Sequence, residues 1–199
     1  MTQKRMIMHI SYITEPLSAA LRTLFATLVL LVFPMGVWGQ TEWTEVSTVE
    51  ALQNIFTNGG NARLGADITK ENYAFEVAAG KTVQLDLAGH TLKINHGINY
   101  HSNVITIPSG GTLTIEDSSV GNAGKITGGN WPRGKGAGIS NSGTLTINGG
   151  TITGNEAPID NNTSGYGGAI HNAPNATLTI NGGDITGNSA HNAGGIYNE

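Results

Sequence analysis

Apolar and polar residues alternate strictly in a tetrapeptide that recurs along the second half of the chain. Thr-Leu-Thr-Ile occurs at residues 112–115, 144–147 and 177–180, with spacings of 32 and 33 residues. Alternation with a period of two is typical of a β-strand, so Leu and Ile share one face and the two Thr share the other. The repeat therefore predicts one half-buried strand in every segment of about thirty residues.

Two further motifs recur in a fixed order around this tetrapeptide. A glycine-rich strand start opens each unit at residues 136–139, 167–170 and 193–196, and a second Ile-containing segment follows the tetrapeptide at 151–155 and 184–188. Asn-Gly-Gly lies between the tetrapeptide and that segment, and it is a turn signal because glycine accepts positive φ at little steric cost. Each unit is expected to hold three short strands separated by turns.

Strands this short are marginal as an isolated sheet, so stacking between units has to bury their apolar faces. A right-handed parallel β-helix achieves this by placing Leu113, Leu145 and Leu178 in one column. The Leu-x-x-Leu-x-Leu frame of leucine-rich repeats and the Trp-Asp signature of a common propeller are missing from the sequence. We therefore expect an all-β fold, with the coils of a right-handed parallel β-helix over residues 62–199.

The segment before the first coil has the pattern of a short amphipathic helix. Ser47 and Glu50 have the spacing of a capping box with Ser47 as N-cap, and apolar residues follow at helical spacing up to Phe56. We expect a helix over 47–57 that covers the first coil, within an N-terminal cap over 40–61. The last segment opens a further coil without a cap, so we expect the β-helix to be truncated at its C-terminal end.

Residues 1–39 have the pattern of a secretory signal peptide. Lys4, Arg5 and Arg22 precede the apolar run 24–33, and small residues follow before a predicted cleavage after Gly39. The alternative is a membrane anchor, but Pro34 interrupts the apolar stretch. We expect export to the outside or the surface (outer membrane) of a bacterium, with no membrane span in the mature chain.

Composition and charge exclude several classes of function. Cleavage removes three cations and one acid from a chain of formal charge −4, which leaves −6 and no basic stripe for nucleic acid. Six His are scattered without metal-ligand spacing, and the absence of Cys means that stacking, not disulfides, stabilises the fold. We expect no catalytic residues, no cofactor and no metal site.

Asparagine recurs at equivalent positions of successive units. Stacking would place identical amides one strand spacing apart, where each can bond to the next and to turn backbone. The alternative is ligand or calcium binding, but the calcium nonapeptide needs an Asp in every repeat, and Asp184 has Thr151 as its counterpart. We expect structural ladders at Asn141/Asn172/Asn198, Asn148/Asn181 and Asn155/Asn188. The paired Thr of each strand suit an exposed strand face, and ice binding is the less favoured interpretation.

Two longer inserts interrupt the regular coils and are the candidates for ligand contact. Residues 128–135 contain Trp131 and Arg133, and residues 156–166 contain Asp160 and Tyr166. Loops on a rigid scaffold commonly carry recognition, and Trp, Tyr and Arg favour interfaces. These four residues are the predicted ligand-contact residues. Stacking of a sugar on Trp131 is one interpretation, and a solvated irregular loop with one partly packed aromatic is the alternative.

The sequence from Gly167 to Ile170, followed by residues 185–190, resembles the repeat of polymorphic outer-membrane proteins, which pairs Gly-Gly-Ala-Ile with Phe-x-x-Asn. Ile152 and Ile185 stand where that repeat has Phe. More broadly the chain resembles the pectin-lyase-like β-helix superfamily. The resemblance implies a non-enzymatic surface passenger, an adhesin or structural stalk whose partners are glycans or host-surface proteins.

The alternative function is a polysaccharide lyase or hydrolase of the same fold whose catalytic coils lie outside these 199 residues. Such enzymes need clustered carboxylates or a cation beside acids. The acids of the coils are instead scattered singly, although Lys125, Arg133 and Lys135 lie in one loop region and could meet an acid in space. The sequence therefore favours binding over catalysis.

Overall fold

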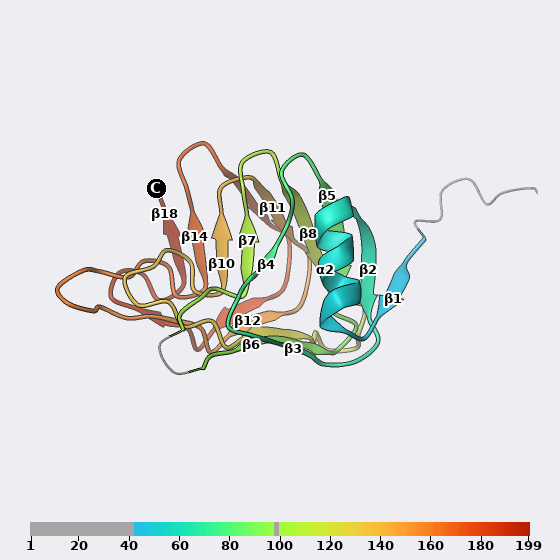
Figure 1. The fold of residues 1–199 in the computed structure, drawn as a ribbon, viewed down its shortest axis with the longest axis horizontal. Helices are drawn as coiled ribbons and strands as arrows, with labels where there is room; N and C mark the ends of the chain where they lie inside the picture. Colours follow the sequence, from blue (N-terminus) through green and yellow to red (C-terminus); the bar gives the residue numbers. More distant parts are fainter. Residues whose placement is uncertain (1–41, 98–99) are drawn as a thin grey trace, which may run out of the picture. The chain divides into compact units, whose positions relative to one another are not determined.

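The computed structural model describes residues 42–97 and 100–199, which form a β-solenoid of parallel strands with a single short helix (Figure 1). The expected signal peptide, residues 1–39, lies outside the described residues, as do the first two residues of the expected N-terminal cap. The parallel β-helix predicted from the repeats is confirmed. The right-handed sense of its winding stays a prediction.

Three sheets run along the solenoid, and successive coils add strands to each. In spatial order the first sheet contains β1 (Thr44–Val46), β2 (Gly60–Leu64), β5 (Thr82–Asp86), β8 (Thr112–Glu116), β11 (Thr144–Ile147) and β15 (Thr177–Ile180). The second contains β3 (Ile68–Glu71), β6 (Thr91–Asn95), β9 (Lys125–Thr127), β12 (Thr151–Thr153) and β16 (Asp184–Thr186). The third contains β4 (Phe75–Glu76), β7 (Ile105–Ile107), β10 (Ile139–Asn141), β14 (Ile170–Asn172) and β18 (Ile196–Asn198). The short strands β13 (Glu156–Ala157) and β17 (Ser189–Ala190) pair beside them.

The Thr-Leu-Thr-Ile strands stack in the register that the repeat predicts. Leu145 of β11 lies opposite Leu113 of β8 and Leu178 of β15, and Ile147 lies opposite its equivalents in the same two strands. Leu113 and Leu145 are fully buried, because coils cover them on both sides, whereas Leu178 is only partly buried in the outermost strand. Full burial of one such side chain contributes roughly 1.5–3 kcal/mol.

A helix, α2 (Val49–Asn58), covers the first coil, as expected, and buries Leu52 and Phe56 (Figure 1). The ring of Phe56 lies 5.9 Å from that of Phe75 on β4, between centroids. The predicted cap residue was wrong by one position. Thr48, in an extended conformation, is the N-cap and its side chain accepts a hydrogen bond from the Ala51 amide at 3.2 Å, so the capping box proposed for Ser47 does not form.

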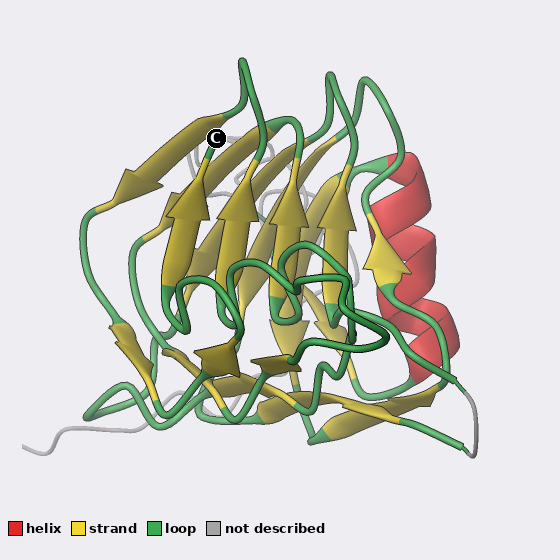
Figure 2. Ribbon diagram, turned by 90° about the vertical axis from the view of Figure 1, so that its left-hand side faces the viewer, coloured by secondary structure: helices red, strands yellow, loops and turns green. Residues whose placement is uncertain are grey.

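The third sheet presents a regular column of outward side chains. Figure 2 shows its strands standing side by side, and the backbone register places Ser140 beside His171 and His171 beside Tyr197. Their neighbours Ile139 and Ile170 point to the opposite face and are fully buried in the core. Outward positions of consecutive coils are thus held about one strand spacing, roughly 4.8 Å, apart. This column is one wall of the candidate site.

Candidate functional site: a cleft beside the third sheet

The two inserts stack on one another just as the coils do. The Trp131 amide donates to the Glu156 carbonyl at 2.9 Å, and the Arg133 amide donates to the Pro158 carbonyl at 3.1 Å. Further along, the Gly136 amide donates to the Tyr166 carbonyl at 2.8 Å. The Tyr166 amide in turn donates to the Gly134 carbonyl at 2.9 Å. Backbone hydrogen bonds between inserts fix both segments, so their side chains are held in place relative to the sheet.

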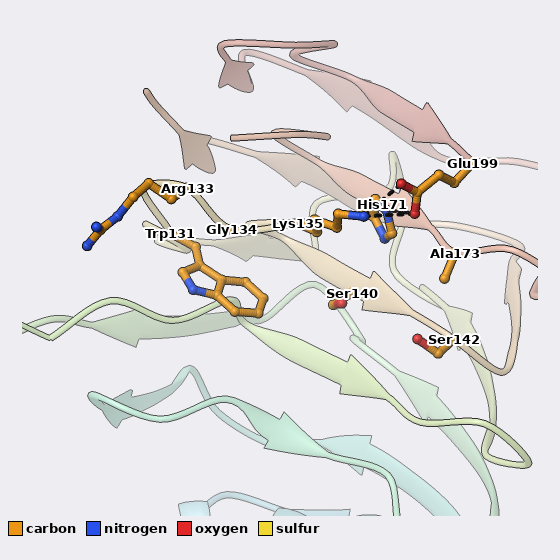
Figure 3. A pocket seen from close by; sticks show the side chains of 9 residues that line it. All are labelled: Trp131, Arg133, Gly134, Lys135, Ser140, Ser142, His171, Ala173 and Glu199. Atoms are coloured by element: carbon orange, nitrogen blue, oxygen red, sulfur yellow. Dashed lines mark hydrogen bonds and ion pairs between the residues drawn. The ribbon is translucent and has the colours of Figure 1, made fainter. Parts of the chain in front are cut away.

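Between the first insert and the outer face of the third sheet lies an open cleft of about 470 Å³. Its walls come from three successive coils, as Figure 3 shows: the insert, strands β10 and β14, and the residue that follows β18. The residues that line it are Trp131, Arg133, Gly134, Lys135, Ser140, Ser142, His171, Ala173 and Glu199. The cleft therefore exists only when the coils stack in the observed register.

The indole of Trp131 lies against the backbone of its own loop. A Cβ placed on Gly134 would overlap the Trp131 ring, so the absence of a side chain at Gly134 lets the ring pack there. The Gly134 amide also donates to the Trp131 carbonyl at 2.9 Å, which closes a tight turn around Arg133, whose φ is +62°. Trp131 is half-buried in this position and presents its remaining surface to the cleft.

Each cation of the cleft is paired with a carboxylate. The Lys135 Nζ lies 2.7 and 2.9 Å from the two Glu199 carboxylate oxygens. The Arg133 Nε lies 3.2 Å from an Asp160 oxygen, and Figure 3 shows the Arg133 side chain directed away from the cluster around His171. The hydrogen bond from Lys135 holds the pKa of Glu199 below its usual value. Glu199 is therefore an anion at neutral pH.

His171 connects the sheet to the Lys135–Glu199 pair. Its Nε2 lies 3.2 Å from the Glu199 carboxylate, its ring stacks on Tyr197 with centroids 5.9 Å apart, and its side chain is 4% exposed. Burial lowers the pKa of His171, and the charge of Lys135 lowers it further, against the opposing effect of Glu199. At neutral pH His171 is an uncharged imidazole whose Nε2–H can donate a hydrogen bond to the Glu199 carboxylate.

Of the four predicted ligand-contact residues, Trp131 and Arg133 line the cleft, whereas Asp160 and Tyr166 do not. Asp160 forms an ion pair with Arg133, and the Tyr166 ring centroid lies 5.9 Å from the Lys135 Nζ. Tyr166 also packs on Tyr197, with 4.8 Å between ring centroids.

Sequence reasoning missed Ser140, His171 and Glu199 as members of the site. Their signal was the alternation itself: Ser140 and His171 each follow the buried Ile of a glycine-rich strand start, so both had to point outward in one column. Glu199 follows Asn198 after the third such Ile. Extending the column by position would have placed these side chains on the wall that faces the first insert.

The asparagine columns form continuous amide ladders. The Asn141 side-chain nitrogen donates to the Asn172 side-chain oxygen at 2.7 Å, and Asn172 donates in the same way to Asn198 at 2.8 Å. Asn155 donates to Asn188 at 2.9 Å, and Asn181 donates to Asn148 at the same distance. Asn141 and Asn155 are fully buried, and these bonds, together with bonds to the Thr177 and Ile126 carbonyls, satisfy their amide donors. No residue of these ladders lines the cleft.

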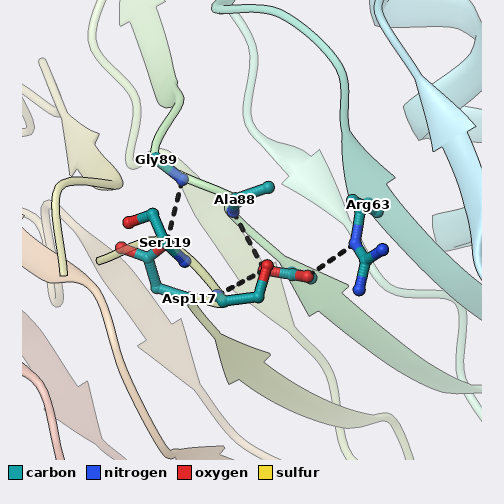
Figure 4. A network of polar contacts seen from close by, with 7 residues as sticks. Arg63, Ala88, Gly89, Asp117 and Ser119 are labelled. Atoms are coloured by element: carbon teal, nitrogen blue, oxygen red, sulfur yellow. Dashed lines mark hydrogen bonds and ion pairs between the residues drawn. The ribbon is translucent and has the colours of Figure 1, made fainter. Parts of the chain in front are cut away.

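Two acids of the coils are used in turns of the backbone. Asp86 is buried, and its carboxylate accepts from the Ala88 and Ser118 amides at 2.9 Å each and from the Arg63 Nε at 2.8 Å (Figure 4). Burial alone would raise the pKa of Asp86, but these hydrogen bonds together lower it. Asp117 accepts from the Gly89, Ser119 and Gly124 amides in the same stack of turns. Both carboxylates therefore join the turns of successive coils through hydrogen bonds to backbone amides.

Within residues 42–97 and 100–199 no group of three or more His, Asp or Glu side chains is arranged to hold a metal ion. In the same part of the chain, no helix has the length and apolar character needed to cross a bilayer.

Comparison of the chain with protein-family models, with curated proteins and with solved structures finds no match. The parallel β-solenoid is shown by its own strand pairing. The resemblance to the pectin-lyase-like superfamily and to polymorphic outer-membrane repeats stays a prediction from the sequence.

Proposed function

We propose that this chain is a non-enzymatic, exported bacterial surface protein whose β-solenoid presents the cleft beside the third sheet to glycans. The observation that carries the proposal is the position of Trp131, which is fixed by Gly134 and faces hydroxyl, imidazole and ion-paired side chains across an open cleft. An aromatic ring beside convergent polar groups is the usual composition of a small-ligand site. A sugar ring can stack its C–H face on the indole while its hydroxyls reach Ser140 and Ser142.

The dimensions of the cleft favour a sugar over a protein partner. Its volume of about 470 Å³ lies within the usual range for small-molecule sites, roughly 300–1,000 Å³. A specific protein partner would instead need about 800 Å² of contact on each side. We therefore propose a glycan as the ligand, and binding of a host-surface protein is the alternative that a binding assay would test.

The acids of the described coils favour binding over hydrolysis. A glycosidase needs two carboxyl groups on either side of the scissile bond, and the residues that line this cleft include one, Glu199. Asp86 and Asp117 are engaged by backbone amides in turns. The alternative function, a polysaccharide lyase or hydrolase, would require catalytic coils outside residues 1–199.

The proposal is tested by measuring binding of the mature chain to an array of immobilised oligosaccharides. Trp131→Ala is expected to weaken the binding of every recognised glycan by at least about tenfold, because stacking on an aromatic ring is lost. Trp43→Ala is the matched control: Trp43 lies before β1, stacks on Arg63, and does not line the cleft. Equal binding by Trp131→Ala and the unaltered chain would contradict the proposal.

Export is tested separately by mass spectrometry of the protein secreted or displayed by its bacterial host. A mature N-terminus at Gln40 is the expected result, and retention of residues 1–39 in the cell-surface product would contradict a cleaved signal peptide. Release of reducing or unsaturated sugar ends from a polysaccharide by the protein as its host produces it would support the enzyme instead.

A further inference from the structure

The charges around the cleft cancel in close pairs. Lys135 is paired with Glu199 at 2.7 Å, and Arg133 is paired with Asp160 at 3.2 Å, so two cations meet two anions. His171 adds no charge at neutral pH, because burial lowers its pKa. The cleft is therefore polar without being electropositive.

Lys135 is also held from a second side. Its Nζ lies 5.9 Å from the centroid of the Tyr166 ring, while two of its distances to Glu199 are shorter than 3 Å. A ligand carboxylate that approached Lys135 would have to displace Glu199 or lie beside it as a like charge. The attraction of that carboxylate to Lys135 is then opposed by the repulsion from Glu199, so the ion pair offers an anion little net gain over a neutral hydroxyl.

The remaining groups suit hydroxyls. Ser140 and Ser142 offer hydroxyls that both donate and accept, and the Glu199 carboxylate retains acceptor positions beside the donors of Lys135. A sugar hydroxyl can donate to a carboxylate oxygen and accept from the neighbouring cation at the same time. The face of Trp131 carries negative electrostatic potential, so it attracts sugar C–H groups and disfavours an anion above it.

We infer that the cleft selects uncharged sugars, and that the Lys135–Glu199 pair sets this selectivity by excluding uronates and other acidic glycans. The inference rests on the proposed function, since it names the class of glycan that the same cleft binds. The net charge of the chain acts in the same direction, because residues 40–199 hold seven cations and thirteen anions, a formal charge of −6.

The test compares matched pairs of immobilised oligosaccharides: sialylated and desialylated forms of one glycan, and hexamers of a uronate and of the corresponding hexose. At low ionic strength the unaltered chain is expected to bind the neutral member of each pair about tenfold or more tightly. Glu199→Gln frees Lys135 and is expected to shift the ratio of acidic to neutral binding about tenfold toward the acidic member. Added salt should reduce this shift, because it screens exposed charges.

Glu50→Gln is the matched control. Glu50 is exposed in the first turn of α2 and does not line the cleft, so the substitution removes one negative charge elsewhere in the chain. It should leave the ratio unchanged, and an equal shift in this control would overturn a local role for Lys135–Glu199. Preferential binding of acidic members by the unaltered chain, lost in Trp131→Ala, would overturn the selectivity while leaving the proposed function in place. Binding of neither class would refute both.

Discussion

Leu145→Ala and Leu178→Ala give the most informative comparison of stability, because the two residues share the same Thr-Leu-Thr-Ile sequence and differ in coverage by neighbouring coils. Leu145 lies between Leu113 and Leu178 and is fully buried, whereas Leu178 belongs to the outermost strand and is half-buried. Replacing a fully buried Leu by Ala lowers the free energy of unfolding by about 2–5 kcal/mol, because apolar burial is lost and a cavity remains.

For Leu178→Ala we expect roughly half of that loss or less, because part of the side chain is already in water. A loss of 1 kcal/mol shifts the melting temperature of a chain of this size by about 2–4 °C, so Leu145→Ala should lower it by roughly 4–20 °C. Circular dichroism during heating and urea titration would measure both variants. Equal destabilisation by the two substitutions would refute the view that adjacent coils bury these positions.

Three further substitutions or conditions test other parts of the structure. Asn172→Ala should lower the free energy of unfolding by about 1–3 kcal/mol, because the buried Asn141 amide loses one of its two acceptors, while Asn148→Ala in the exposed ladder should lower it by less than about 0.5 kcal/mol, as urea unfolding would show. Gly134→Ala should displace Trp131 and weaken glycan binding about tenfold with little change in melting temperature, and Gly195→Ala, where a Cβ meets no atom within 4 Å, is its control. Stability should fall as pH decreases below about 6.5, because burial lowers the pKa of His96 and of His171 and the unfolded chain then binds more protons. A melting temperature that is equal or higher at about pH 5.5 than at pH 7.5 would contradict that linkage.

The fold was readable from the sequence because each coil repeats the same local rules. Thr-Leu-Thr-Ile specifies a half-buried strand, Asn-Gly-Gly ends it, and a fixed spacing aligns Leu113 with its equivalents. The first residue of the helix does not follow from the pattern alone, because Ser47 and Thr48 are adjacent residues that can both serve as the N-cap. Thr48 has the extended backbone of the N-cap and accepts from the Ala51 amide, and the capping pattern does not distinguish it from Ser47.

The candidate site was predictable in part. Composition alone singled out Trp131, Arg133, Asp160 and Tyr166, because they interrupt a regular repeat with aromatic and charged side chains. Their partners depend on which insert lies over which strand. Glu199 meets Lys135 across 64 residues of sequence, and nothing local to either residue indicates that contact.

The stacking of coils underlies both the fold and the cleft, and distances between spin labels measure it directly. The chain contains no Cys, so single cysteines can be introduced and labelled at Asn61 together with Thr114, Thr146 or Thr179. These outward positions lie in one row of the first sheet, two, three and four strands away from Asn61. The backbone separations are about 10, 14 and 19 Å, and the distances between nitroxides that electron paramagnetic resonance measures should increase in the same order, by about one strand spacing per coil. Distances that fail to increase in this order, or that exceed about 30 Å, would contradict the parallel stack.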